Sequence, residues 1–330
     1  MATAAARTQV TEKKLMLFAG RANQELASEI AECLGIRLGK VDLNTFANGE
    51  IHVKYGDSMR GADVFIFQSH SDPINERIME QLIMIDAAKR ASAKRITAVC
   101  PFYGYSRQDR KASGREPISA RLLADLLTVA GVDRVITVDL HTGQIQGFFD
   151  KPVDHLTALP GLTKYLRETI DGDVVVVAPD AGGGKMARRF ADHLGADIAF
   201  IDKRRPPGTM NTAVATEVVG DVAGKTAVIV DDMIDTAGTV TSAAELLMSR
   251  GAVSVYVAAT HGLLSGPAVE RLEAAPIEQV VVTNTLEIAP DKRFDKLHVL
   301  SVADVIAQAL RAVFDDTSVS EIFEGENIRS

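Results

Sequence analysis

Two adjacent carboxylates followed by a loop of small and hydroxyl-bearing residues form the most informative segment of this sequence, Val228–Thr239. The apolar run Ala227–Val230 is typical of a buried parallel strand. We expect the loop after it to lie at the carboxyl end of that strand, where open α/β sheets bind ligands. The hydroxyls and backbone N–H groups of Thr236, Gly238 and Thr239 open a predicted helix, and a helix N-terminus favours anions.

Asp231 and Asp232 can accept hydrogen bonds from a diol. A phosphate-binding loop beside a diol-binding pair suits a ribose 5-phosphate group. The alternative is that both carboxylates are solvated and that Asp235 or Thr236 only caps the helix. The complete string after a buried strand favours the ligand interpretation.

A second loop rich in functional groups, residues 101–110, reads Pro-Phe-Tyr-Gly-Tyr-Ser-Arg-Gln-Asp-Arg and follows another apolar run. Its aromatic faces can stack on a nucleobase, and its amide and carboxylate can bond the edges of that base. Arg107 can pair with phosphate oxygens. A surface loop whose aromatic residues cover a sheet edge is equally compatible with these residues.

His141 and Asp180 each follow a predicted buried strand, in the runs Val138-Asp-Leu-His and Val176-Val-Ala-Pro-Asp. Neighbouring strand ends would let them share a hydrated divalent ion. Mg²⁺ keeps several waters and takes only one or two protein ligands beside substrate phosphates. A purely structural histidine is the alternative.

Two common nucleotide-binding motifs are absent. The segment Gly182–Lys185 is not a Walker A loop, because Pro179 and Met186 occupy positions where that motif needs Gly and Ser or Thr. No GxGxxG fingerprint follows a predicted strand, so a nicotinamide cofactor has no support.

A run of cations, Asp202-Lys-Arg-Arg-Pro-Pro-Gly208, follows the predicted strand Ile198–Ile201. Two prolines and a glycine indicate a loop. Its cations could close over a polyphosphate and neutralise charge in a phosphoryl-transfer transition state. A solvated basic turn is the alternative.

Composition bounds the possible classes of protein. The chain has 330 residues, enough for two domains, and its net charge of −8 does not suggest nucleic-acid binding. Cys33 and Cys100 cannot form a disulfide framework and fit a reducing compartment, so we expect a cytoplasmic protein. Met1–Lys14 lacks the apolar stretch of a secretory signal, and no apolar run is long enough to cross a bilayer.

Strand-like and helical patterns alternate along the chain, which predicts parallel sheets flanked by helices. The strands are expected at Leu15–Ala19, Val64–Gln68, Ile96–Cys100, Val135–Asp139, Val174–Ala178, Ile198–Ile201, Val228–Val230, Val253–Ala259, Val280–Thr283 and Leu297–Ser301. The helices are expected at Asn23–Leu34, Asn75–Ala91, Ser119–Ala130, Met186–Leu194 and Val240–Ser249.

A faint internal repeat relates the unit that begins at Val64 to the unit that begins at Val228. We expect two similar α/β domains in tandem, residues 1–157 and 158–330, with the last helix packing back on the first domain. The first copy has Ser69–Ile74 where the second has its acidic phosphate loop, so only the second should hold the sugar phosphate. General resemblance among doubly wound folds is the alternative explanation.

Taken together, the motifs resemble ribose-phosphate diphosphokinases (PRPP synthetases) of the class I bacterial type along nearly the whole chain. The segments that carry the resemblance are Phe46–Glu50, Arg60–Phe65, Tyr103–Arg110, Val138–His141, Gln146–Phe149, Pro179–Gly183, Asp202–Pro206 and Val230–Thr239. The resemblance implies two tandem domains of the type I phosphoribosyltransferase fold. It also implies transfer of the diphosphoryl group of MgATP to the C1 hydroxyl of ribose 5-phosphate, giving PRPP and AMP for nucleotide, histidine and tryptophan biosynthesis.

The resemblance also implies residue roles. Asp231 and Asp232 would bind the ribose hydroxyls, and the 5-phosphate would lie on Asp235, Thr236, Ala237, Gly238 and Thr239. Arg107, Gln108 and Asp109 would bind ATP, and Phe46, Asn48, Gly49 and Glu50 would complete the adenine pocket from a neighbouring subunit. His141 and Asp180 match Mg²⁺ positions, with two ions per site expected. Lys203 and Arg205 match the catalytic loop, and Arg205 would also contact the sugar phosphate.

Members of this family form homohexamers, commonly inhibited by ADP and activated by inorganic phosphate. Ser58, Arg60 and Ser113 fall in the corresponding regulatory segments. Ala237 stands where Gly is frequent, so we expect a negative φ there. Two other classes share parts of the pattern: nucleotide-forming phosphoribosyltransferases, which would be shorter, and non-catalytic PRPP synthetase-associated proteins, which would have degraded catalytic loops.

Overall fold

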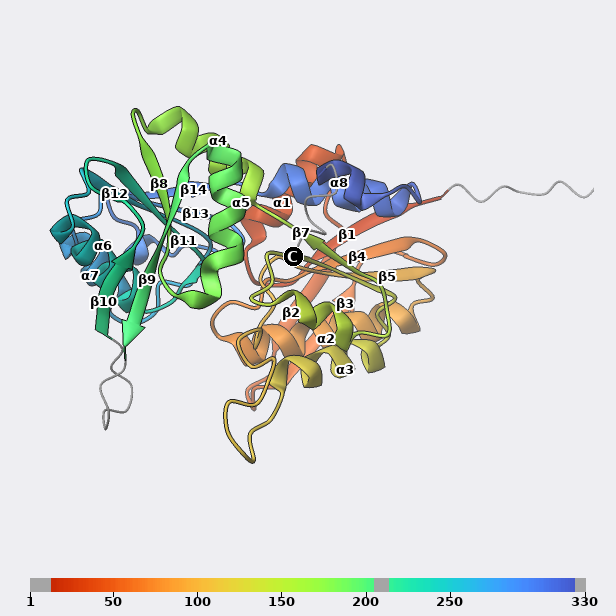
Figure 1. Ribbon diagram of the computed structural model, residues 1–330. Helices are drawn as coiled ribbons and strands as arrows, with labels where there is room; N and C mark the ends of the chain where they lie inside the picture. Colours follow the sequence, from red (N-terminus) through yellow and green to blue (C-terminus); the bar gives the residue numbers. More distant parts are fainter. Residues whose placement is uncertain (1–12, 205–213, 324–330) are drawn as a thin grey trace, which may run out of the picture.

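The computed structural model describes residues 13–204 and 214–323, which form two parallel sheets flanked by helices (Figure 1). The first sheet has the order β1-β4-β5-β6-β7, and all its neighbouring strands are parallel. Its strands are β1 (Leu15–Ala19), β4 (Asp63–Phe67), β5 (Arg95–Cys100), β6 (Arg134–Val138) and β7 (Val153–Leu156). The predicted α/β class is confirmed.

The second sheet has the order β10-β9-β8-β11-β12-β13-β14, and only the edge strand β10 runs antiparallel. Its strands are β8 (Val174–Ala178), β9 (Asp197–Arg204), β10 (Val214–Val219), β11 (Thr226–Ile234), β12 (Ser254–Gly262), β13 (Gln279–Thr283) and β14 (Leu297–Leu300). Near-continuous apolar runs suit these central strands because both faces of the sheet are covered.

The helices cover both faces of each sheet. They are α1 (Gln24–Leu34), α2 (Ile74–Arg90), α3 (Ser119–Ala130), α4 (Leu159–Thr169), α5 (Gly184–Leu194), α6 (Gly238–Ser249), α7 (Ala268–Ala274) and α8 (Ala303–Phe314). Alternate strand residues face different cores. One core lies under α2 and α3, another under α6 and α7, and a third runs through both domains beneath α1, α4, α5 and α8. The two domains therefore share buried apolar packing.

The predicted internal duplication is confirmed by the order of elements. The first copy runs β1-α1-hairpin-β4-α2-β5-α3-β6-β7, and the second runs β8-α5-hairpin-β11-α6-β12-α7-β13-β14. The hairpin of the first copy is a separate antiparallel pair, β2 (Val41–Thr45) and β3 (Ile51–Tyr55), and that of the second is β9–β10. The turn of the first hairpin thus corresponds to the cation-rich loop of the second.

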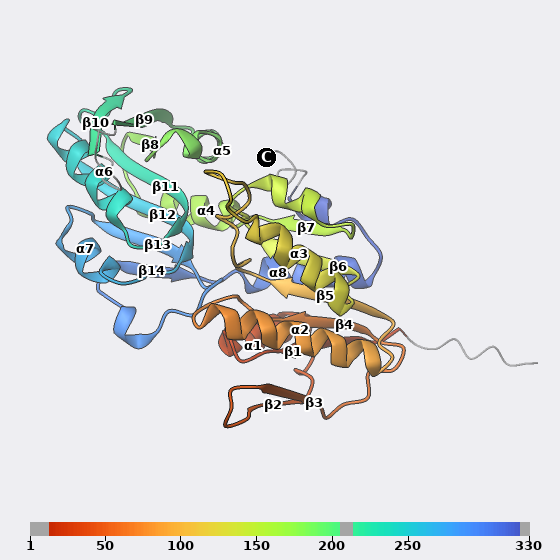
Figure 2. The same ribbon diagram turned by 90° about the horizontal axis from the view of Figure 1, so that it is seen from below.

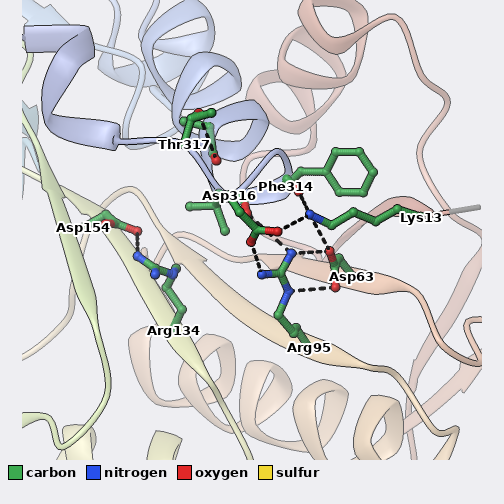
Figure 3. Close-up of polar contacts among 10 residues, drawn as sticks. Lys13, Asp63, Arg95, Arg134, Asp154, Phe314, Asp316 and Thr317 are labelled. Atoms are coloured by element: carbon green, nitrogen blue, oxygen red, sulfur yellow. Dashed lines mark hydrogen bonds and ion pairs between the residues drawn. The ribbon is translucent and has the colours of Figure 1, made fainter.

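The last helix packs back on the first domain, as predicted: α8 lies beside α1 above the first sheet (Figure 1). Arg311 of α8 donates to the carbonyl of Leu34 at 2.9 Å. Beyond α8, Asp316 receives hydrogen bonds from Arg95 at 2.5 Å and from Lys13 at 2.7 Å (Figure 3). Within the described parts of the chain, no helix is long and apolar enough to span a bilayer.

Arg95 also holds a buried charge. It binds the carboxylate of Asp63 with both Nε and Nη2, and the side chain of Asp63 is only 3% exposed. We predict that Arg95→Met lowers the free energy of unfolding by about 3 kcal/mol, because it leaves a buried carboxylate without its main partner. Urea unfolding monitored by circular dichroism measures this change.

Lys13→Met is the matched control, since Lys13 lies 3.9 Å from the same carboxylate but is the more distant partner. Its loss should cost no more than about 1 kcal/mol. Equal losses in the two variants would contradict the role assigned to Arg95.

Candidate functional site

The carboxyl ends of the two sheets face each other, and the polar residues singled out in the sequence gather there. Asp231 and Asp232 lie inside β11 rather than in the loop after it, because that strand continues to Ile234 and pairs with β12 as far as Gly262. The expected strand end at Val230 was therefore wrong. Pairing with a long neighbour supplies backbone hydrogen bonds that outweigh the poor strand propensity of aspartate.

The adjacent carboxylates of β11 differ in protonation behaviour. Burial, reinforced by the charge of Asp232, raises the pKa of Asp231. Burial acts in the same direction on Asp232, but the hydrogen bond and charge of His141 outweigh it and lower the pKa of that group. Asp232 is thus the residue held as a carboxylate, whereas burial and the neighbouring negative charge disfavour the charged form of Asp231.

His141 bridges the two domains, because its Nδ1 lies 2.8 Å from Oδ2 of Asp232. The pKa of His141 is raised, chiefly by this hydrogen bond and further by the charges of Asp232, Asp109 and Asp231. An ionised carboxylate only accepts, so Nδ1 carries a proton, and in the neutral form of the ring Nε2 keeps a lone pair. A histidine that donates one N–H to a carboxylate and offers its other nitrogen is the usual arrangement beside a metal.

Asp180 begins the loop after β8, where its Oδ1 accepts hydrogen bonds from the N–H groups of Gly182 and Gly183 at 2.9 and 3.1 Å. Its charge also contributes to the raised pKa of Asp231. Among the described residues no cluster of three or more His, Cys, Asp or Glu side chains could hold a metal by itself. A pair of ligands such as His141 and Asp180 would suit only an ion, such as Mg²⁺, that takes its remaining ligands from water and substrate oxygens.

The loop between β11 and α6 leads directly into the N-terminus of a helix. Ala237 adopts a left-handed conformation with φ of 60°, so the expected negative φ was wrong. The carbonyl of Ala237 accepts hydrogen bonds from the N–H and hydroxyl of Thr241, and these bonds offset a strain of about 1 kcal/mol. The turn lets Gly238 and Thr239 open the helix, with Thr236 exposed just before it.

The loop after β5 brings further polar residues from the first domain to Asp235. Nη1 of Arg107 donates to Oδ2 of Asp235 at 2.7 Å, which joins the predicted ATP loop to the predicted phosphate loop. Burial acts to raise the pKa of Asp235, but hydrogen bonds from Ser265 and Arg107 outweigh it and lower that pKa. Both residues are partly exposed and available to ligands.

Two further polar residues of this loop, Gln108 and Asp109, accept hydrogen bonds from hydroxyl groups elsewhere in the first domain. Oδ2 of Asp109 accepts a hydrogen bond from Thr142 at 2.9 Å, directly beside His141. Oε1 of Gln108 accepts one from Ser119 at the beginning of α3, at 2.6 Å. Hydrogen bonds and charge interactions therefore link six residues where the two domains meet, here called the interdomain site: Arg107, Asp109, His141, Asp231, Asp232 and Asp235.

The hairpin β2–β3 lies at the edge of the molecule distant from the second sheet, and so apart from the interdomain site (Figure 2). Phe46 is 54% exposed, and its N–H donates to the carbonyl of Glu50 at 2.8 Å. Asn48 accepts from the N–H of Glu50 at 3.2 Å, and Gly49 has a φ of 91°, which favours glycine. Within a single chain, Phe46, Asn48, Gly49 and Glu50 therefore lie away from the interdomain site.

The predicted catalytic cations are only partly described. Lys203 lies near the end of β9, and Arg205 lies outside the described residues. The predicted regulatory residues do not converge within one chain. Ser58 and Arg60 precede β4, whereas Ser113 follows β5, where its N–H and hydroxyl donate to Glu116. Parallel strands place these two segments at opposite ends of the sheet.

One group of buried residues at this junction was quoted in the sequence motifs without a role. Oδ2 of Asp139 accepts a hydrogen bond from Thr260 of β12 at 2.7 Å. Nε2 of His261 lies 3.1 and 3.0 Å from the carbonyls of Val138 and Asp139. Polar residues at the ends of two buried strands were the available signal, but the sequence does not reveal that these strands belong to different domains.

Comparison with known proteins gives two matching family models. Residues 15–131 match the N-terminal domain of ribose phosphate pyrophosphokinase, and residues 202–324 match the phosphoribosyl synthetase-associated domain. The chain is 55% identical over 314 residues to the ribose-phosphate pyrophosphokinase of Streptomyces coelicolor, covering 95% of this chain and 97% of that protein. It is 56% identical over 316 residues to the enzyme of the same name from Mycobacterium tuberculosis, with the same coverage.

A solved structure is also similar along the chain. The phosphoribosylpyrophosphate synthetase of Mycobacterium smegmatis shares 54% sequence identity and gives a TM-score of 0.87, covering 92% of this chain and 100% of that one. Sequence and fold therefore point to the same family. The chain belongs to the ribose-phosphate pyrophosphokinase (PRPP synthetase) family.

Proposed function

We propose that the protein makes PRPP from ATP and ribose 5-phosphate at this interdomain site, where each of the two duplicated domains binds one substrate. The observation that carries the proposal is the meeting of two half-sites, joined by the contacts of His141 with Asp232 and of Arg107 with Asp235. Transfer of a diphosphoryl group needs both substrates in line, so positioning supplies much of the rate. Residues 1–157 and 158–330 are the corresponding domains.

The second domain holds the sugar phosphate. The N-terminus of α6 directs backbone N–H groups toward the 5-phosphate, helped by the hydroxyls of Thr236 and Thr239. Asp231 and Asp232 accept hydrogen bonds from the ribose hydroxyls. Asp232 is anchored by His141 at 2.8 Å, which fixes the sugar relative to the first domain.

The first domain holds ATP. Arg107 pairs with phosphate oxygens after leaving Asp235, while Gln108 and Asp109 are held in place by Ser119 and Thr142. The exposed turn Phe46–Glu50 completes the adenine pocket of a neighbouring copy. Two observations support that assignment: the turn Phe46–Glu50 lies away from the interdomain site of its own chain, and the ring of Phe46 is exposed.

His141 and Asp180 hold Mg²⁺ together with substrate oxygens, and a second ion is held mainly by the substrates. The available Nε2 of His141 and the surrounding negative charge support this assignment. When bound, the ion neutralises phosphate charge and orients the diphosphoryl group. Asp232 contributes by fixing the imidazole ring of His141.

Lys203 and Arg205 stabilise the transition state. The C1 hydroxyl oxygen of the sugar attacks the β-phosphorus, the bond from that phosphorus to the oxygen of the α-phosphate breaks, and AMP leaves. The protein supplies no nucleophile. Lys203, near the end of β9, and Arg205, which follows that strand in the sequence, neutralise the charge that spreads over the transferred group.

Substitution Lys203→Ala tests this assignment. We predict that turnover falls by at least about a hundredfold while the dissociation constants of ATP and ribose 5-phosphate stay nearly unchanged, because the cation acts mainly in the transition state. AMP formation gives turnover, and isothermal titration calorimetry gives binding.

Lys225→Ala is the control, since Lys225 pairs with Asp197 at 2.8 Å at the opposite end of β9 and β11. It should retain the turnover of the unmodified enzyme. Unchanged turnover in Lys203→Ala would remove Lys203 from the mechanism.

A homohexamer is the expected assembly, and the exposed face of α3 supports association between copies. Four apolar side chains with helical spacing remain exposed along it: Ile118, Leu122, Leu126 and Val129. Val129 alone is 78% exposed, which is unusual for such a stripe on a monomer. The free thiols of Cys33 and Cys100 fit a cytoplasmic location.

Regulation by ADP and inorganic phosphate is expected to involve Ser58, Arg60 and Ser113 from different copies. Separation of these residues at opposite ends of one sheet supports a pocket between subunits. We predict that Arg60→Ala abolishes activation by phosphate and weakens inhibition by ADP about tenfold, because an arginine pairs strongly with phosphate oxygens.

Steady-state rates at varied phosphate and ADP concentrations measure both responses. Arg90→Ala, which removes an exposed arginine of the same domain paired with Asp86, is the control. Normal responses to both effectors in Arg60→Ala would contradict the regulatory assignment.

A further inference from the structure

The connection between β4 and α2 occupies, in the first copy, the position of the phosphate loop in the second copy. It differs in character, since Gln68, Ser69 and His70 are each no more than 1% exposed. These three buried residues offer no open anion site. Their polar side chains must instead be satisfied inside the protein.

His70 binds the backbone on both sides of Tyr103, just before the residues assigned to ATP, 107–109. Its backbone N–H donates to the carbonyl of Phe102 at 3.2 Å. Its Nδ1 accepts a hydrogen bond from the N–H of Gly104 at 3.0 Å. An added Cβ on Gly104 would lie 3.1 Å from Cβ of His70, so the two residues are already in close contact.

A hydrogen bond between Nε2 and Gln81 fixes the orientation of the imidazole ring of His70. Because Nδ1 is an acceptor, the proton lies on Nε2, which donates to Oε1 of Gln81 at 2.9 Å. Gln81 in turn donates to the carbonyl of Ile66 at 3.1 Å and accepts from Cys100 at 3.3 Å. All these side chains are fully buried, so breaking one bond leaves a polar group without water to replace it.

The contact at Gly104 extends along the loop to a residue assigned to ATP. The hydroxyl of Tyr103, between the two clamped residues, donates to the carbonyl of Ala120 at 3.0 Å. The N–H of Ala120 donates to the carbonyl of Gln108 at 3.2 Å. Displacement of residues 102–104 would therefore move Gln108 as well.

We propose that His70 is a positioning residue for nucleotide binding: it holds the backbone of residues 102–104 so that Arg107 and Gln108 present the correct geometry to ATP. The connection between β4 and α2, which corresponds to the phosphate loop of the second copy, thus supports the loop after β5 in the same domain. This inference rests on the proposed assignment of residues 107–109 to ATP.

The test measures dissociation constants of MgATP and of ribose 5-phosphate separately, together with the thermal midpoint of unfolding. His70→Leu removes the acceptor for the Gly104 N–H, and ATP binding should weaken about tenfold while sugar phosphate binding changes by less than about twofold. His70→Asn places Oδ1 close to the position of Nδ1. It should recover most of the ATP affinity although it lacks the bond to Gln81.

Two controls separate positioning from loss of stability and from failure of the site assignment. Ile30→Val removes one methylene from the buried face of α1, and it should lower the thermal midpoint without changing either affinity. Arg107→Ala tests directly whether the loop binds ATP. If His70→Leu does not fold, His70→Ala, which also removes the acceptor for the Gly104 N–H, should show the same selective loss of ATP affinity.

Selective loss in His70→Leu with recovery in His70→Asn supports the inference. Unchanged ATP affinity in the His70 variants, alongside weaker binding in Arg107→Ala, overturns it and leaves the proposed site intact. Equal losses for both substrates, or no recovery by asparagine, also overturn it, because the acceptor would not be the cause. Unchanged ATP affinity in every variant would overturn both the inference and the ATP assignment of the loop.

Discussion

The buried carboxylate of Asp139 joins the two sheets at the point where their reactive side chains meet. Its Oδ2 accepts hydrogen bonds from the N–H of Ala158 at 2.9 Å and from Thr260 at 2.7 Å, and its own carbonyl lies 3.0 Å from Nε2 of His261. Each bond replaces water that the burial of this junction excludes. These hydrogen bonds fix the backbone at Asp139 and thereby help to position His141, which follows two residues later.

The duplication of the α/β domain explains how one interdomain site can serve two substrates. Each copy ends its parallel strands at the same edge, where ligands bind in α/β folds. In the second copy a helix N-terminus remains open to solvent. In the first copy the equivalent loop is closed by Gln68 and His70, and the loop after β5 carries the exposed cation Arg107 instead.

Sequence patterns identified the parallel strands because apolar runs are the direct consequence of burial on both faces. The strand at Leu15–Ala19 and the helix at Ser119–Ala130 have the predicted bounds. The hairpin β2–β3 was missed although its residues alternate, because its strands are short and mostly exposed. The extension of β11 through Asp231 and Asp232 depends on pairing with β12, which local propensity does not contain.

The residues of the site divide in the same way. Asp231, Asp232 and Thr239 stand in one continuous string, so their types and spacing were sufficient to suggest a ligand. The partnership of His141 with Asp232 spans 91 residues and two sheets, and only the fold reveals it. The left-handed conformation of Ala237 was also unpredictable, because hydrogen bonds from Thr241 hold a residue that locally prefers negative φ.

The most direct test of two half-sites acting as one is the dependence of ATP cleavage on the sugar. Purified protein would be incubated with MgATP, with and without ribose 5-phosphate, and AMP and PRPP would be quantified together. The account predicts that AMP appears only with the sugar and in a one-to-one ratio with PRPP. AMP released at the same rate without the sugar, or no AMP at any phosphate and Mg²⁺ concentration, would contradict it.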